Sequence, residues 1–227
     1  MLSVKSESCL HWQHILRASR SSHEAQFKIP SAAYFAILEA FPLPIARALL
    51  EGKRAQDVSR PNVSLLFTDI VGFTKMSSEM RAEKVSSLLN RLYQKFDLLS
   101  YHHGVQKIDI VGDSYIAATN FTEEQNSDHA ARLARWAIDA VAEAAKTTLL
   151  DEENPSLGFV QIRVGMHTGP VCGTVLGRQA QKYTLIGDSV NIASRMESTS
   201  EAGRIQCSEA FALVVQDQVE EIFTDPR

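Results

Sequence analysis

The sequence has little cysteine and no long apolar run. Its 227 residues include only three cysteines, Cys9, Cys172 and Cys207, and no CxxC pair. An odd number of cysteines without paired spacing argues against a disulfide framework and indicates reduced thiols. No stretch approaches the roughly 18 consecutive apolar residues that a membrane span needs, and no signal peptide is recognisable. These absences predict a cytoplasmic chain without a membrane span of its own.

An excess of positive charge is also missing. The 23 lysines and arginines are outnumbered by 27 aspartates and glutamates, which gives a formal net charge of −4. Such a chain offers no basic surface to nucleic acid, although a phosphate-bearing substrate is compatible with it if metal ions supply positive charge locally. What the sequence does contain, 44% hydrophobic residues, is enough for one globular core with an appended segment.

The chain divides into two regions of different texture. Residues 1–60 are rich in Ser, Ala, Lys and Arg and contain two short helical patterns, at 30–41 and 43–53. We expect a helical linker there, either one that transmits signals and pairs with a second copy or a plain exposed helix. Residues 61–227 alternate between strand and helix patterns and are expected to form the main domain.

The patterns in this second region predict an α+β fold. We expect strands at 63–71, within 105–120 on both sides of Gly112, and at 159–169, 170–177, 182–186 and 203–208, and helices at 77–104, 127–150 and 189–198. The order β-α-β-β-α-β indicates a ferredoxin-like α/β sandwich, with helices on one side of a mostly antiparallel sheet.

Two aspartates stand out against this pattern. The stretch LLFTDIVG (65–72) places Asp69 inside an apolar strand, where an unpaired carboxylate is costly. Asp113, in IVGDSY, lies at another strand edge after a glycine that permits a tight turn. If the two lie side by side, they repel each other unless cations sit between them, and oxygen ligands without His or Cys suit Mg²⁺ or Mn²⁺. The alternative is that each acid only caps a turn.

Four motifs, LFTDIVGFT, VGDSYIAAT, IRVGMHTGPVCGTVLG and YTLIGDSVNIASRMES, follow in order between residues 63 and 208. Together they resemble the catalytic domain of class III nucleotide cyclases, more closely the guanylyl than the adenylyl branch. The resemblance implies conversion of a purine nucleoside triphosphate into its 3′,5′-cyclic monophosphate and pyrophosphate, as part of intracellular signal transduction.

The resemblance also implies a role for each matching position. Asp69 and Asp113, with the Ile70 carbonyl, match the ligands of two Mg²⁺ or Mn²⁺ ions. The remaining positions match groups that hold the substrate: Gly72, Phe73, Thr74 and Arg163 for the phosphates, Asn191 for the ribose, and Arg195 for the transition state. The alternative for Asn191 and Arg195 is an ordinary polar helix face.

Base recognition is implied at Asp109 and Thr184, where neither the usual guanylyl pair (Glu and Cys) nor the usual adenylyl pair (Lys with Asp or Thr) is present. An ionised aspartate only accepts hydrogen bonds, and guanine offers donors where adenine N1 is an acceptor, so GTP is favoured over ATP. Alternatively, Asp109 forms a surface pair with Lys107 on the same strand.

The family resemblance implies a homodimer whose two active sites lie at the interface, because one chain carries both halves of the machinery. Family members also continue into a C-terminal hairpin with a phosphate-binding lysine, whereas this sequence ends at EEIFTDPR. We therefore expect either a fragment of a longer, membrane-attached or soluble protein, or an impaired enzyme. A nucleotide-binding regulatory module without turnover is the alternative from another functional class.

Overall fold

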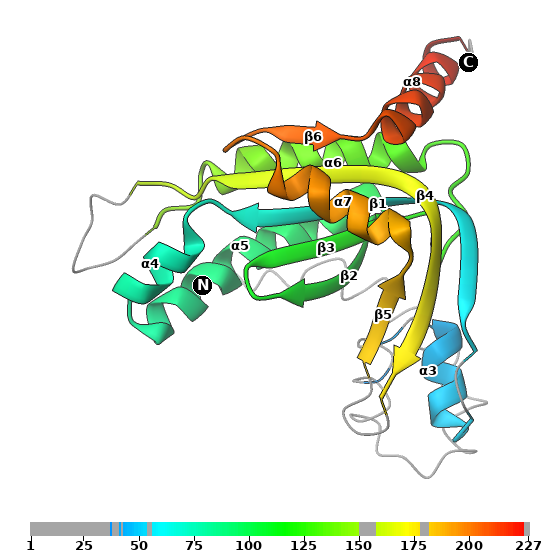
Figure 1. Ribbon diagram of the computed structural model, residues 1–227, viewed down its shortest axis with the longest axis horizontal. Helices are drawn as coiled ribbons and strands as arrows, with labels where there is room; N and C mark the ends of the chain where they lie inside the picture. Colours follow the sequence, from blue (N-terminus) through cyan, green and yellow to red (C-terminus); the bar gives the residue numbers. More distant parts are fainter. Residues whose placement is uncertain are drawn as a thin grey trace, which may run out of the picture. The chain divides into compact units, whose positions relative to one another are not determined.

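A six-stranded sheet organises the computed structural model, which describes residues 37, 41, 43–53, 56–149, 158–177 and 182–224 (Figure 1). Its strands are β1 (Val58–Ile70), β2 (Gln106–Val111), β3 (Ser114–Thr119), β4 (Ile162–Leu176), β5 (Lys182–Ile186) and β6 (Ile205–Cys207). The strand order is β2-β3-β1-β4-β5, with β6 paired to β4. The β1–β3, β1–β4 and β2–β3 pairs are antiparallel and the β4–β6 pair is parallel, so the expected mixed fold is confirmed.

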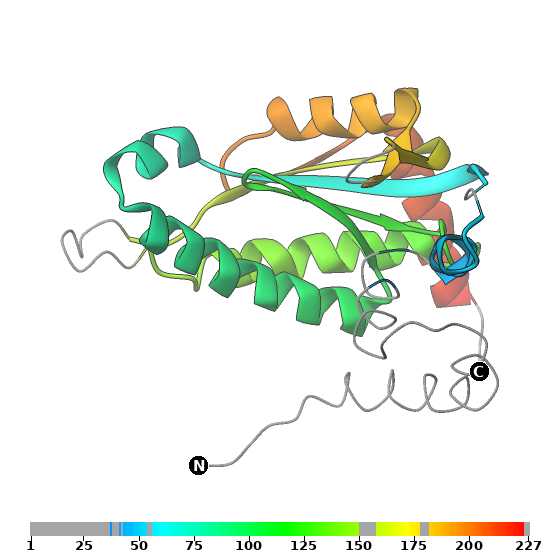
Figure 2. The ribbon, with the colours of Figure 1, turned by 90° about the horizontal axis from the view of Figure 1, so that it is seen from below.

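Helices cover both faces of this sheet. They are α4 (Phe73–Glu79), α5 (Ala82–His103), α6 (His129–Ala144), α7 (Asp188–Ser198) and α8 (Glu209–Thr224). Figure 2 shows α5 and α6 below the sheet and α7 above it. The expectation that the helices lie on one side is therefore wrong for α7.

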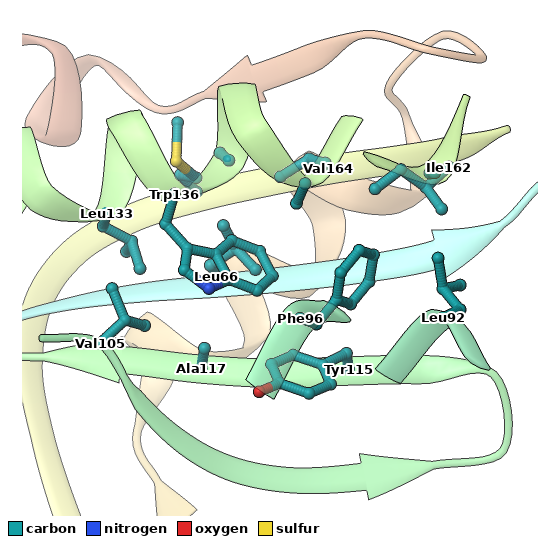
Figure 3. Close-up of a cluster of buried hydrophobic side chains, with 14 of the residues drawn as sticks. Leu66, Leu92, Phe96, Val105, Tyr115, Ala117, Leu133, Trp136, Ile162 and Val164 are labelled. Atoms are coloured by element: carbon teal, nitrogen blue, oxygen red, sulfur yellow. The ribbon is translucent and has the colours of Figure 1, made fainter. Parts of the chain in front are cut away.

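The main core lies between the sheet and the α5–α6 pair. Aromatic rings dominate it: the Phe96 ring centroid lies 5.3 Å from that of Trp136, and Tyr115 stacks on Trp136 at 5.5 Å (Figure 3). Leu66 from β1 and Val164 from β4 complete this layer and are fully buried. Burial of these large apolar side chains fixes the two central strands, and the end of β1 and the start of β4 meet at the candidate site described below.

The chain forms two compact units, Met1–Asp57 with Gly177–Tyr183, and Val58–Leu176 with Thr184–Arg227. In the first unit the structure describes helix α3 (Leu43–Leu50), which confirms the helical pattern at 43–53. Most of the pattern expected at 30–41 lies outside the described residues. The second unit contains nearly the whole sheet, and the boundary expected near residue 60 stays a prediction.

Three elements differ from the sequence expectation. The single helix expected at 77–104 is two helices, because Met80 is extended (φ −103°, ψ 152°) and turns its side chain into the protein. The strands expected at 159–169 and 170–177 are one strand, β4. Its pairing with β1 is irregular between Arg60 and Val63, so Pro170 sits where the regular ladder is already interrupted. Helix α8 was not anticipated.

Candidate active site

The centre of the candidate site is a pair of neighbouring strand residues. Asp69, near the end of β1, lies directly opposite Arg163, near the start of β4. The Arg163 Nη2 donates a hydrogen bond to the Asp69 Oδ2, which also makes the two an ion pair. The side chains are 21% exposed for Asp69 and 32% exposed for Arg163, so the pair is partly accessible to solvent. The Asp69 carboxylate is thus paired with an arginine of the same chain.

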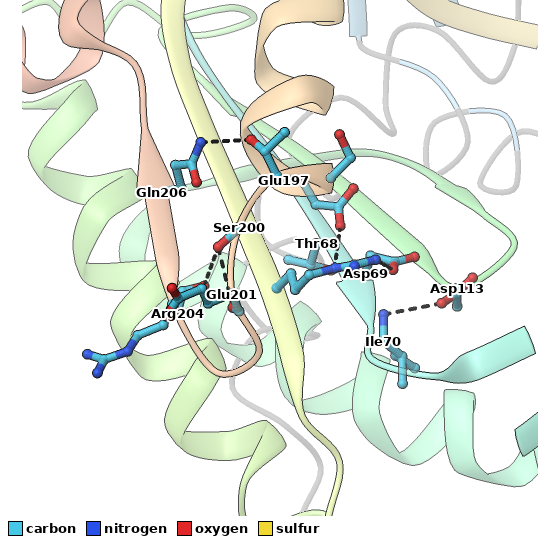
Figure 4. Close-up of polar contacts among 12 residues, drawn as sticks. Thr68, Asp69, Ile70, Asp113, Glu197, Ser200, Glu201, Arg204 and Gln206 are labelled. Carbon is cyan, nitrogen blue, oxygen red and sulfur yellow. Dashed lines mark hydrogen bonds and ion pairs between the residues drawn. The ribbon is translucent and has the colours of Figure 1, made fainter. Parts of the chain in front are cut away.

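Asp113 reaches the same place from the β2–β3 hairpin. Gly112, with a φ of 63°, forms the turn before it, and the Asp113 Oδ2 accepts a hydrogen bond from the Ile70 N–H at 3.2 Å (Figure 4). Burial, then a hydrogen bond to the Asp69 carboxylate and its charge, raise the pKa of Asp113 from 3.8 to about 6. The structure therefore brings the two carboxylates together, as the sequence pattern led us to expect.

Sequence reasoning missed a third carboxylate, Glu197. Its Oε1 accepts a hydrogen bond from the Arg163 Nε at 3.1 Å, and its side chain is only 10% exposed. Burial, with the nearby charge of Asp69, raises the pKa of Glu197 although the guanidinium opposes this effect. The signal was in the sequence: Ser189, Ala193 and Glu197 follow at four-residue spacing and form the buried stripe of α7.

A glycine of β4 explains how α7 comes this close. A Cβ atom on Gly165 would lie 1.9 Å from the Glu197 backbone nitrogen and 2.5 Å from its Cα. Only a residue without a side chain fits there, so the C-terminal end of α7 rests directly on the strand backbone. Because Gly165 is two residues from Arg163, this contact places Glu197 beside the guanidinium.

Asn191 and Arg195 lie on the other side of α7. Both are exposed, one helical turn apart, while Ala193 between them faces the sheet. Within a single chain these two side chains therefore face solvent, as the resemblance requires if they serve the active site of a second copy. Their catalytic roles stay a prediction.

The expected base-reading residues lie on strands at the two ends of the strand order. Asp109, in β2, is partly buried, and its Oδ1 accepts a hydrogen bond from the Ile110 N–H at 2.8 Å. Thr184, in β5, is also partly buried. The Lys107 Nζ lies 2.9 Å from the Asp97 carboxylate and over the Tyr115 ring. Lys107 therefore pairs with Asp97, and the alternative ion pair of Lys107 with Asp109 is wrong.

The expected phosphate-binding turn lies between β1 and α4. Gly72 has a φ of 74°, in the left-handed region that favours glycine, and its carbonyl accepts a hydrogen bond from the Met76 N–H at 3.0 Å. Gly72 and Thr74 are exposed and Phe73 is half-buried. The turn follows Ile70 directly, next to the carboxylate pair, and its phosphate-binding role stays a prediction.

The donor set fits a hard divalent cation. Three carboxylates, Asp69, Asp113 and Glu197, lie at the site with one guanidinium, that of Arg163, which pairs with Asp69 and Glu197, so carboxylates outnumber cationic groups there. Among the described residues no group of three or more His, Cys, Asp or Glu side chains is placed to hold a metal ion. Two carboxylates would therefore need further oxygens, from the backbone and from substrate phosphates. Mg²⁺ is commonly held by one or two carboxylates and substrate phosphates in this way.

The antiparallel sandwich and its paired strand-end carboxylates define an α+β catalytic domain of the nucleotide cyclase class. Residues 56–225 match the family described as the adenylate and guanylate cyclase catalytic domain. The chain belongs to this family. It is 36% identical over 180 residues to retinal guanylyl cyclase 2 of Mus musculus, a match that covers 79% of this chain and 16% of that protein. The chain thus corresponds to about a sixth of the length of this relative.

Solved structures agree with this assignment. The guanylate cyclase domain of RhGC from Catenaria anguillulae, in complex with GTP, is 34% identical with a TM-score of 0.64, over 70% of this chain and 84% of that one. A non-canonical dimeric guanylyl cyclase domain of the RhoGC fusion protein from Blastocladiella emersonii is 32% identical with a TM-score of 0.62, over 70% and 85% of the two chains. In the described part of this chain, no helix is long and apolar enough to cross a membrane.

Proposed function

We propose that this chain forms cyclic GMP and pyrophosphate from GTP, as a catalytic domain in intracellular signal transduction. The observation that carries the proposal is the convergence of the Asp69 and Asp113 carboxylates beside Arg163. Two carboxylates at one strand edge, with a cationic side chain next to them, suit the binding of a triphosphate together with divalent cations. The family match supports the reaction class, and the similarity to guanylyl cyclase domains supports GTP.

The reaction is an in-line displacement at the α-phosphorus. The 3′-hydroxyl oxygen of the ribose forms a bond to phosphorus, its proton passes to solvent water, and the bond to the departing pyrophosphate breaks. Two Mg²⁺ or Mn²⁺ ions on Asp69, Asp113 and the Ile70 carbonyl would lower the pKa of the hydroxyl and neutralise the leaving group. Arg163 would hold the phosphate oxygens, with the backbone of Gly72–Thr74 beside it.

The other half of the machinery comes from a second copy of the chain in this proposal. Asn191 would orient the ribose and Arg195 would stabilise the charge that develops on the pentavalent phosphorus. Both side chains are exposed in the single chain, and a two-fold dimer would place each helix α7 over the carboxylates of its partner. We propose that the helical segment before residue 60 transmits a regulatory signal to this dimer.

ATP is the second candidate substrate, because the family includes both branches and Asp109 and Thr184 match neither usual pair. Guanine is favoured on hydrogen-bond grounds. An ionised Asp109 can accept hydrogen bonds from the guanine N1–H and N2–H₂ groups. Adenine N1 is itself an acceptor, so no hydrogen bond could form between it and the carboxylate.

The deciding experiment is a paired assay of the purified chain with Mn²⁺–GTP and Mn²⁺–ATP under identical conditions, with product identified by chromatography. We expect cyclic GMP as the main product, and loss of activity in both Asp69→Ala and Asp113→Ala. The matched control is Asp139→Ala, which removes an aspartate from the exposed surface of α6. Cyclic AMP as the main product would reassign the substrate, and nucleotide binding without any product would indicate a regulatory module.

A further inference from the structure

We propose that Glu197 is a positioning residue, which holds Arg163 beside the carboxylate pair so that its outer nitrogen can transfer from Asp69 to the triphosphate. This inference rests on the proposed function, because it concerns how the same site binds its substrate. Glu197 was not part of the machinery that the sequence motifs imply.

The guanidinium of Arg163 is held through two of its nitrogens by two different carboxylates. Its Nε donates to Glu197 at 3.1 Å, and its Nη2 donates to Asp69. The two partners differ in exposure: the Glu197 side chain is 10% exposed and the Asp69 side chain is 21% exposed. The guanidinium is planar and rigid, so fixing the Nε edge also fixes the direction in which Nη2 points.

Glu197 is itself held firmly. Its backbone lies against Gly165 of β4, where even a Cβ atom would find no room, and it sits on the buried stripe of α7. The side chain thus approaches Arg163 from a helix that is anchored two residues along the same strand. A carboxylate placed in this way is an anchor for the arginine, whereas Asp69 is the partner that can be exchanged.

The exchange follows from a conflict over Asp69. In the metal-free chain Arg163 supplies the positive charge that Asp69 needs inside its strand. When Asp69 takes up a divalent cation, Nη2 loses its acceptor, and a partly buried donor of a charged group is costly to leave unpaired. The non-bridging oxygens of a triphosphate are suitable new acceptors. Glu197 keeps the arginine in place during this transfer.

The test compares Glu197→Gln with Glu201→Gln, which removes the same formal charge from an exposed position four residues further on. In the glutamine variant at 197 the arginine is less firmly anchored and pairs with Asp69 alone. We expect the KM for Mn²⁺–GTP to rise about tenfold, with kcat changed by less than about threefold. Mn²⁺ binding without nucleotide, followed by electron paramagnetic resonance, should weaken several-fold. Glu201→Gln should change none of these, and Glu197→Asp should recover part of the loss.

A second variant separates positioning from a simple loss of negative charge. Arg163→Gln removes the group that competes for Asp69, so Mn²⁺ alone should bind more tightly while Mn²⁺–GTP binds more weakly. Adding Glu197→Gln to Arg163→Gln should then raise the KM no further, because Glu197 acts through the arginine. Additive effects of the two substitutions would overturn the proposal, and weaker Mn²⁺ binding by Arg163→Gln would overturn it even if Glu197→Gln fails to fold.

The test does not depend on turnover. If the unmodified chain formed no cyclic nucleotide, the proposed function would fail, but calorimetric binding of 3′-deoxy-GTP with Mn²⁺ would still report on Glu197. About tenfold weaker binding by Glu197→Gln than by Glu201→Gln would support the positioning role. Equal binding by the two variants, with equal melting temperatures, would refute it.

Discussion

The two aspartates of the site have different partners although they lie side by side. Asp69 is paired with the cationic side chain of Arg163. For Asp113, the one interaction with another residue that favours its charged form is the hydrogen bond from the Ile70 backbone N–H. The charge of Asp113 is therefore the less compensated one. In the metal-free protein the ionised carboxylate costs stability, a cost that protonation or a bound cation would remove.

Asp113→Asn should consequently stabilise the metal-free fold while it removes activity. The folded-state pKa of Asp113 is raised to about 6, so the protonated form stabilises the fold at low pH, and this contribution is lost as the pH rises through about 6. We expect the variant to gain about 1–2 kcal/mol in free energy of unfolding at pH 7, after allowance for solvent screening. Urea unfolding in EDTA between pH 4 and pH 8 measures this difference.

Asp69→Asn is the control for this prediction. The same substitution at Asp69 also relieves the repulsion between the carboxylates, but it breaks the ion pair with Arg163, so no gain is expected. Equal stabilisation by both variants would mean that Arg163 contributes nothing to Asp69, and the two carboxylates would then be equally uncompensated in the metal-free protein.

Tyr93, on α5, presents a second residue-level contrast. Its hydroxyl is buried and has no hydrogen-bond partner among the described residues, whereas the Tyr115 hydroxyl bonds Ser100 and Asp97. Burial, with the charges of Asp113 and Asp69, raises the pKa of Tyr93, so it remains a neutral hydroxyl without a partner. Tyr93→Phe should therefore be neutral or stabilising by up to about 1 kcal/mol in EDTA, while Tyr115→Phe should cost about 1–2 kcal/mol.

These two variants share the same chemistry, so each serves as the control for the other in thermal and urea unfolding. A loss of more than about 1 kcal/mol in Tyr93→Phe would show that its hydroxyl has a partner in solution, such as an ordered water.

At the scale of elements, helix α7 is held by matched small residues. Its buried stripe, Ser189, Ala193 and Glu197, lies along β4 where two glycines leave room. A Cβ on Gly165 would meet backbone atoms of Glu197 and Met196 within 2.5 Å, whereas one on Gly169 would meet mainly the Ser189 hydroxyl, at 2.5 Å. A side-chain hydroxyl can rotate away, but a helix backbone cannot.

Gly165→Ala should accordingly displace α7 and cost more stability than Gly169→Ala. We expect a loss of about 2 kcal/mol or more for Gly165→Ala, and clearly less for Gly169→Ala. The displaced helix also removes Glu197 from Arg163, so the KM for GTP should rise in the first variant. Thermal unfolding and steady-state kinetics measure the two effects. Equal stability losses would show that the strand, rather than the helix contact, requires glycine.

The sequence predicted those elements whose pattern is local. Alternation and helical spacing located β1, the β2–β3 hairpin, α6 and α7, and the two strand-end aspartates suggested a shared site before any contact was known. Other features depend on pairing between distant segments. Whether Pro170 interrupts β4 is decided by the irregular partner strand at Arg60–Val63, and whether Glu197 is a surface or a site residue is decided by Gly165. Neither can be read from one segment alone.

At the scale of the whole molecule, the proposed site consists of two groups of residues on different parts of the chain. The carboxylates and Arg163 lie at one strand edge, and Asn191 and Arg195 lie on the exposed side of α7. If the site forms between two copies, activity should rise more than linearly with protein concentration at low concentration, because a single copy lacks half of each site. Sedimentation analysis under the assay conditions should place the midpoint of this rise at the dimer dissociation constant.

Mixing two inactive variants tests this arrangement directly. Asp69→Asn should inactivate the metal half of a site and Arg195→Ala the helix half, so each homodimer should be inactive. In a mixed dimer both lesions fall into one site and the other site is intact. Random exchange of equal amounts makes about half of the dimers mixed, each with one intact site of two, so about a quarter of the unmodified activity should return.

The control mixes Asp69→Asn with Asp113→Ala, which are two lesions of the same half, and should restore no activity. No recovery in the first mixture would place the complete site within a single chain, whereas recovery in this control would mean that Asp69 and Asp113 serve different halves of the site.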